Sequence, residues 1–155
     1  MTSRAVLAHG FTQTSRSWDT IVRRLVELRP GTDAVAVDLP GHGDANDVAT
    51  DLWGAADHLV RAGGNAAYVG YSMGGRVALH AAIAHPDAVE RLVLIGATAG
   101  LDHADQRAER RAADERLAER IEAIGVEAFV DEWLANPLFA GLDDASAMRS
   151  DRLRN

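Results

Sequence analysis

Ala66-Ala67-Tyr68-Val69-Gly70-Tyr71-Ser72-Met73-Gly74-Gly75-Arg76 is the stretch that decides the fold. Residues 66–69 form an apolar run typical of a buried strand, and a helical pattern begins at Met73. Small residues on both sides of Ser72 permit a sharp strand-to-helix turn, on which the serine hydroxyl projects free at the top of a sheet. Because the strand and the helix supply the context that a bare Gly-x-Ser-x-Gly match lacks, we predict a nucleophile position at Ser72.

Three more short apolar runs alternate with helical patterns around this stretch. The runs span residues 5–8, 34–37 and 92–95, and the helical patterns span residues 18–28, 51–62 and 73–85. Such alternation is typical of parallel strands that are buried on both faces. The sequence therefore predicts an α/β fold, a parallel sheet with helices on both faces.

The composition changes near residue 102. Residues 105–122 are rich in Arg, Asp, Glu and Ala at helical spacing, Gly125 separates them from a second helical pattern, and Pro137 interrupts that pattern. We expect residues 1–101 to form the N-terminal part of the core and residues 102–155 to form a helical lid over the strand ends.

Composition and charge exclude several classes of protein. The 155 residues include no cysteine, which removes disulfides, thiolate nucleophiles and cysteine zinc sites. A net charge of −7 argues against a nucleic-acid partner, since binding to phosphates needs a basic face. No run is long and apolar enough to span a membrane, and an apolar strand pattern by Ala5 leaves no room for a signal peptide. We expect a cytoplasmic protein.

Two backbone amides are candidates for an oxyanion hole. The Met73 amide lies at a helix N-terminus, where the helix dipole favours negative charge. The second donor should come from the loop His9-Gly10-Phe11, and we choose the Phe11 amide; the alternative is an ordinary turn at a strand end. The loop from Asp38 to Gly43 is interpreted as a structural rim with a solvated His42, and the alternative is that His42 approaches a ligand.

A general base for Ser72 is not evident in the chain. In this arrangement the order along the chain is Ser, then Asp or Glu, then His. Outside the helix of Ser72, His103 alone follows it, and no strand-end acid precedes His103 at the right place. None of the six histidines fits the base.

These motifs resemble the α/β-hydrolase superfamily, and more narrowly its 2-succinyl-6-hydroxy-2,4-cyclohexadiene-1-carboxylate synthase branch in menaquinone biosynthesis. The resemblance rests on four segments, which are Leu7-Ala8-His9-Gly10-Phe11, Val37-Asp38-Leu39-Pro40-Gly41-His42-Gly43, Gly70-Tyr71-Ser72-Met73-Gly74-Gly75-Arg76 and Leu92-Val93-Leu94-Ile95-Gly96-Ala97. It implies an enzyme that eliminates pyruvate from a cyclohexene carboxylate, without metal or organic cofactor.

The same resemblance implies the substrate contacts. Arg76, four residues after the serine, is similar to an arginine that holds a substrate carboxylate, although a helix-surface arginine paired with an acid is the alternative. Tyr71, Arg110, Trp133 and Arg154 complete the implied set. Several arginines suit a small-molecule carboxylate, because each guanidinium offers a bidentate fork.

The resemblance also implies that the chain stops before the strands that carry the catalytic Asp and His. Whether the chain alone is an enzyme therefore stays open. A plain serine hydrolase is the first alternative to the synthase. A non-catalytic remnant, or a half that needs a partner, is the second, since residues 92–95 would form an exposed sheet edge open to self-association.

Overall fold

The computed structural model describes residues 3–143 and 147–155. The chain divides into two compact units. The first unit extends to Thr98 and includes Arg154 and Asn155, and the second comprises Ala99–Leu153. No helix in the described part of the chain is long and apolar enough to cross a membrane.

The first unit is built on a parallel sheet, which confirms the predicted fold class. Among the described residues this sheet has four strands in the order β2-β1-β3-β4. The strands are β1 (Ser3–Ala8), β2 (Thr32–Val37), β3 (Ala66–Tyr71) and β4 (Val89–Ile95). All four carboxyl ends therefore meet at one edge of the sheet, where ligands bind in open α/β folds.

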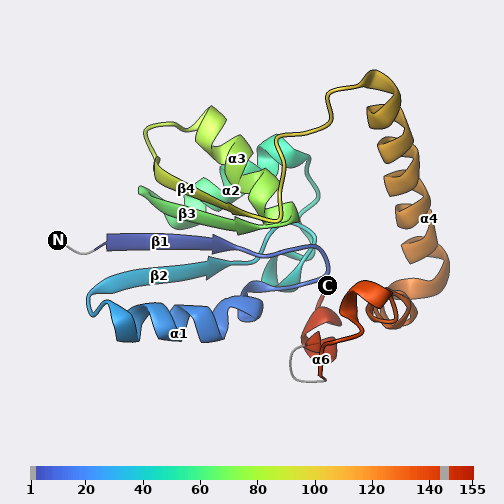
Figure 1. Cartoon of the computed structure of the whole chain (residues 1–155), viewed down its shortest axis with the longest axis horizontal. Helices are drawn as coiled ribbons and strands as arrows, with labels where there is room; N and C mark the ends of the chain where they lie inside the picture. Colours follow the sequence, from blue (N-terminus) through green and yellow to red (C-terminus); the bar gives the residue numbers. More distant parts are fainter. Residues whose placement is uncertain (1–2, 144–146) are drawn as a thin grey trace. The chain divides into compact units, whose positions relative to one another are not determined.

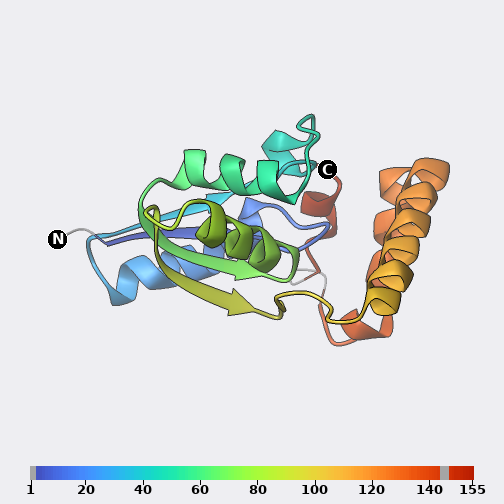
Figure 2. The same cartoon turned by 90° about the horizontal axis from the view of Figure 1, so that it is seen from above.

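Helices cover both faces of the sheet (Figures 1 and 2). Helix α1 (Asp19–Leu28) lies on one face, and α2 (Leu52–Gly63) and α3 (Met73–Ala84) lie side by side on the other. The Asp51 carboxylate caps α2 by accepting from the Gly54 amide at 2.9 Å. Two short 3₁₀ helices, η1 (Ser15–Trp18) and η2 (Gly43–Ala45), have no counterpart in the sequence prediction.

The core of the first unit lies between the sheet and the pair α2 and α3. Val6, Leu59 and Tyr68 are fully buried there, with Val77 beside them. Burying each large apolar side chain contributes roughly 1.5–3 kcal/mol. The buried Tyr68 hydroxyl donates to the Gly64 carbonyl at 2.6 Å, so its polar atom is satisfied. This packing gives a rigid base for the loops at the strand ends.

The second unit is helical. It contains α4 (Ala104–Leu134), η3 (Pro137–Phe139) and α6 (Arg149–Arg152). Gly125 has φ 80° and ψ 162° within α4, so it breaks the regular helix at the predicted separation. Trp133 stacks on Phe129 at a centroid distance of 5.9 Å, and Arg149 pairs with Asp131. The unit therefore has an aromatic cluster of its own.

Candidate active site

Ser72 lies on a strained turn directly between β3 and α3. Its φ of 51° and ψ of −113° lie outside the regions that side-chain-bearing residues ordinarily adopt. The Ser72 amide donates to the Ile95 carbonyl at 2.8 Å, and the Ser72 carbonyl accepts from the Gly75 amide at 3.1 Å. Strain of this kind persists only where neighbouring structure enforces it, and it clusters at functional sites. The turn has the geometry expected of a nucleophile elbow.

Glycines around the serine allow close backbone packing. A Cβ on Gly74 would lie 2.5 Å from the His9 carbonyl oxygen, and a Cβ on Gly70 would lie 2.6 Å from the Cα of Gly75. Neither position can hold a side chain without displacing backbone. The first turn of α3 is thus pressed against the end of β1 and the loop that follows it.

The two amides chosen for the oxyanion hole lie on these neighbouring segments. Met73 begins α3, so its amide has no acceptor within the helix. Phe11 follows the loop segment that Gly74 contacts, and it precedes Thr12, which has an unusual φ of 64°. The structure therefore brings the two donor segments together, while the oxyanion role of both amides stays a prediction.

Two buried histidines join the loop after β1 to the loop after β2. His9 accepts from the Leu39 amide through Nε2 at 3.0 Å, and His42 accepts from the Thr12 amide through Nε2 at 3.3 Å. Each Nδ1 therefore carries the proton and donates to a carbonyl, of Gly10 at 2.9 Å and of Pro40 at 3.1 Å. The expectation of a solvated His42 is wrong: the side chain is buried, the rings of His9 and Phe11 lie 5.1 and 6.0 Å from its own ring, and Thr12 and Pro40 bind its two ring nitrogens.

Asp38 organises the loop after β2. Its carboxylate accepts from the Ser15 amide at 2.6 Å and from the Asp44 amide at 2.9 Å. Burial raises the pKa of Asp38, but these hydrogen bonds outweigh burial and leave the pKa below its ordinary value. Burial, by contrast, lowers the pKa of His42 and outweighs the hydrogen bond to Pro40. Both groups therefore act as fixed structural partners at neutral pH.

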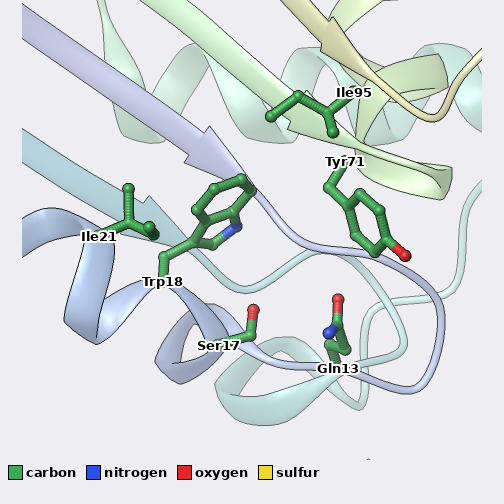
Figure 3. Close-up of a pocket in the computed structure, with 6 residues that line it drawn as sticks. All are labelled: Gln13, Ser17, Trp18, Ile21, Tyr71 and Ile95. Atoms are coloured by element: carbon green, nitrogen blue, oxygen red, sulfur yellow. The ribbon is translucent and has the colours of Figure 1, made fainter. Parts of the chain in front are cut away.

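A pocket of about 240 Å³ opens beside the elbow. In Figure 3, Trp18 and Tyr71 face each other across it, below Ile95. The complete lining is Gln13, Ser17, Trp18, Ile21, Tyr71 and Ile95. The Trp18 Nε1 atom is buried without a hydrogen-bond partner among the residues that the structure describes. The pocket is thus largely apolar, with Gln13 and Ser17 as its polar lining residues.

Comparison with known proteins decides the family. The family model described as "Alpha/beta hydrolase family" matches residues 5–154. The chain belongs to the alpha/beta hydrolase family. A solved alpha/beta hydrolase neighbour, MenH from S. aureus, superposes with a TM-score of 0.83 at 28% sequence identity, covering 99% of this chain and 61% of that one.

Curated relatives of this alpha/beta hydrolase bear the name 2-succinyl-6-hydroxy-2,4-cyclohexadiene-1-carboxylate synthase. The relative from Escherichia coli O1:K1 is 32% identical, over 90% of this chain and 56% of its own length. A Bacillus subtilis protein, provisionally given the same name, is 35% identical over 97% of this chain and 58% of its own length. The resemblance found in the sequence is confirmed, and the chain spans a little over half the length of these relatives.

The histidines of this alpha/beta hydrolase are engaged away from the serine. His58 and His80 donate to backbone carbonyls, and His85 pairs with Asp57 at 2.6 Å. His103 lies at the N-terminus of α4, in the second unit. Within residues 3–143 and 147–155, no side chain forms a hydrogen bond with Ser72 Oγ. No catalytic base for Ser72 is therefore identified among these residues, and its source stays a prediction.

The predicted substrate contacts have different surroundings. Arg76 is half-buried in the first turn of α3, and its guanidinium has no hydrogen bond or ion pair with any described residue. Arg110 is exposed and makes a bidentate contact with Asp114 at 2.8 and 2.9 Å. Trp133 packs in the aromatic cluster of the second unit, and Arg154 pairs with Asp44 in the first. Arg76 is therefore the best placed of the four to receive a carboxylate.

No group of three or more histidine or acidic side chains able to hold a metal ion occurs in the described part of the chain. Sequence reasoning missed two contributors to the loops at the strand ends, Thr12 and Asn155, and misjudged the burial of a third, His42. Their contacts join positions 30 or more residues apart, so no local pattern marks them.

Proposed function

We propose that this chain supplies the serine, the oxyanion hole and a carboxylate-binding arginine of an enzyme that eliminates pyruvate from a cyclohexene carboxylate in the cytoplasm. The observation that carries the proposal is the guanidinium of Arg76, which pairs with no described residue and lies one helical turn from the strained Ser72. A half-buried cation without a partner is suited to an anionic ligand. The synthase names of the relatives support the same substrate class.

The reaction follows from the roles of these groups. Ser72 Oγ, once deprotonated by a histidine from outside the described residues, removes a proton from a ring carbon next to a carbonyl group. The resulting enolate oxygen receives hydrogen bonds from the Phe11 and Met73 amides. The electron pair then forms a ring double bond as the C–O bond to the three-carbon unit breaks. That unit takes up a proton and leaves as pyruvate, and no bond to Ser72 forms.

A fusion protein tests this proposal. The 155 residues replace the matching segment of the Bacillus subtilis relative, whose remaining part, outside the 58% that the alignment covers, is kept. Release of pyruvate, coupled to lactate dehydrogenase, is expected from the fusion and not from its Ser72→Ala variant. Rapid hydrolysis of a chromogenic ester with a burst, and no release of pyruvate, would identify a plain serine hydrolase instead.

Arg76 gives the proposal a second test. We expect Arg76→Gln to raise the KM of the fusion about tenfold or more, since a hydrogen bond between charged groups contributes about 1.5–3 kcal/mol. Arg23→Gln, an exposed site on α1, is the matched control and should leave KM unchanged. Equal KM values for the two variants would remove Arg76 from the substrate site.

A second candidate, a half that requires a partner, rests on the edge of the sheet. Strand β4 is an edge strand, and Val93, Leu94 and Ile95 expose 37–48% of their surface. A bare apolar edge favours pairing with another chain. We therefore propose that the isolated chain self-associates through β4 and lacks turnover alone.

A further inference from the structure

Asn155 connects two loops of the first unit. Its Nδ2 donates to the Thr12 carbonyl at 2.8 Å, and its Oδ1 accepts from the Gly43 amide at 3.1 Å. Both functional atoms of the side chain are therefore used. The partners lie 143 and 112 residues earlier in the chain, on the loops that follow β1 and β2.

Thr12 is held on both sides of its backbone. Its amide donates to His42 Nε2, and its carbonyl accepts from Asn155. The residue is buried, and its φ of 64° is uncommon for a β-branched side chain. A strained backbone of this kind needs surrounding contacts to maintain it. His42 and Asn155 supply those contacts.

The position of Asn155 is itself fixed by its neighbour. Arg154 forms an ion pair with Asp44, the residue after Gly43. The Asp44 amide in turn donates to the Asp38 carboxylate. Arg154 thus attaches the segment that carries Asn155 to the loop after β2, and this attachment holds Asn155 near Thr12.

We infer that Asn155 is a positioning residue for the oxyanion hole. Thr12 follows Phe11 directly, so the peptides on both sides of Thr12 are fixed when its amide and its carbonyl are bound, and this restrains the backbone of Phe11. Loss of the Asn155 amide would free the Thr12 carbonyl and let the Phe11 amide turn away from the oxyanion. The catalytic part of this inference rests on the proposed function, whereas the loop contacts do not.

Hydrogen exchange in the 155-residue chain tests the contacts without any activity. Asn155→Ala should speed exchange at least about tenfold in peptides that cover residues 9–14 and 40–46. Asn155→Asp keeps the acceptor for the Gly43 amide and loses the donor to Thr12, so only the first peptide should change. Asn65→Asp, at an exposed site whose side chain bonds to no described residue, is the control for the added charge. Unchanged exchange in Asn155→Ala would overturn the inference.

The fusion protein tests the catalytic consequence. Asn155→Asp should lower kcat roughly tenfold to a hundredfold, with KM within about twofold, because small displacements of catalytic groups cost rate more than binding. If the unmodified fusion hydrolyses esters but releases no pyruvate, the proposed function fails, and the same kcat comparison is made with the ester. Unchanged kcat in Asn155→Asp would overturn the positioning role with either substrate.

Discussion

Gly74 lies directly against the backbone of Ala8: a Cβ on Gly74 would be 2.5 Å from the Ala8 carbonyl carbon. This approach joins the N-terminus of α3 to the end of β1, which are 66 positions apart in the chain. The oxyanion donors of the proposed site depend on that junction, because Met73 begins α3 and Phe11 lies in the loop that follows β1. Glycine at position 74 is thus a condition of the site as well as of the fold.

Gly74→Ala should destabilise the chain. The added methyl group meets backbone atoms that cannot rotate away, and such overpacking costs about 1–3 kcal/mol. Urea unfolding followed by tryptophan fluorescence gives the free energy of unfolding. Gly141→Ala is the matched control, since a Cβ there meets nothing within 4 Å, and it should change stability by less than about 0.5 kcal/mol. Equal stability of the two variants would contradict the close packing.

Ser72→Gly should stabilise the chain while it removes the nucleophile. Glycine adopts the φ of 51° without steric cost, whereas strain at a side-chain-bearing residue costs about 1–3 kcal/mol. The greater freedom of glycine in the unfolded state offsets part of this gain, so we expect a net increase of about 1 kcal/mol. Ser72→Ala retains the Cβ and should match the stability of the unmodified chain. A Gly variant less stable than the Ala variant would refute strain at the elbow.

Stability should fall as pH drops below about 6.5, in part because of His42. Burial keeps folded His42 neutral, while the unfolded residue gains a proton near its ordinary pKa, so acid favours the unfolded state. His42→Gln removes this titration and should lose less stability than the unmodified chain between pH 7 and pH 5. Asp38, whose pKa is lowered, affects stability only below about pH 4, so this range separates the two groups. Parallel pH profiles would contradict the burial of His42.

Val93→Lys should reduce self-association. Val93 is 48% exposed on the edge strand β4, and a lysine there opposes edge-to-edge pairing. Sedimentation velocity of the 155-residue chain should show a shift toward the monomer. Val48→Lys adds the same charge at an exposed position outside the sheet and should leave the distribution unchanged. An equal shift in both variants would indicate a general effect of charge instead of β4 pairing.

The sheet and the elbow could be predicted from the sequence because their signals are local. Short apolar runs mark the buried strands, and the small residues around Ser72 mark the turn. Gly125 marks the break in α4 for the same reason, since its φ of 80° favours glycine. The pair Arg110 and Asp114 is also local, at the spacing of one helical turn.

The loop contacts could not be predicted because they depend on tertiary structure. His42 is buried and has a partner in another loop, so the expectation that this loop histidine is solvated was wrong. Asn155 and Thr12 are 143 positions apart in the sequence, and they are brought into contact by the tertiary structure. The strained φ of Thr12 has no sequence signal, since threonine rarely adopts it.

The division of the chain has a consequence for how the protein can diversify. Ala99–Leu153 leaves the first unit after Thr98, and the chain rejoins that unit at Arg154. The segment is thus a continuous insertion between two fixed attachment points. Segments of this kind tolerate replacement, since the strands and their hydrogen bonds lie outside them. Exchanging residues 99–153 for the corresponding segment of another family member should therefore leave the elbow, and the Asn155 contact that follows the insertion, intact.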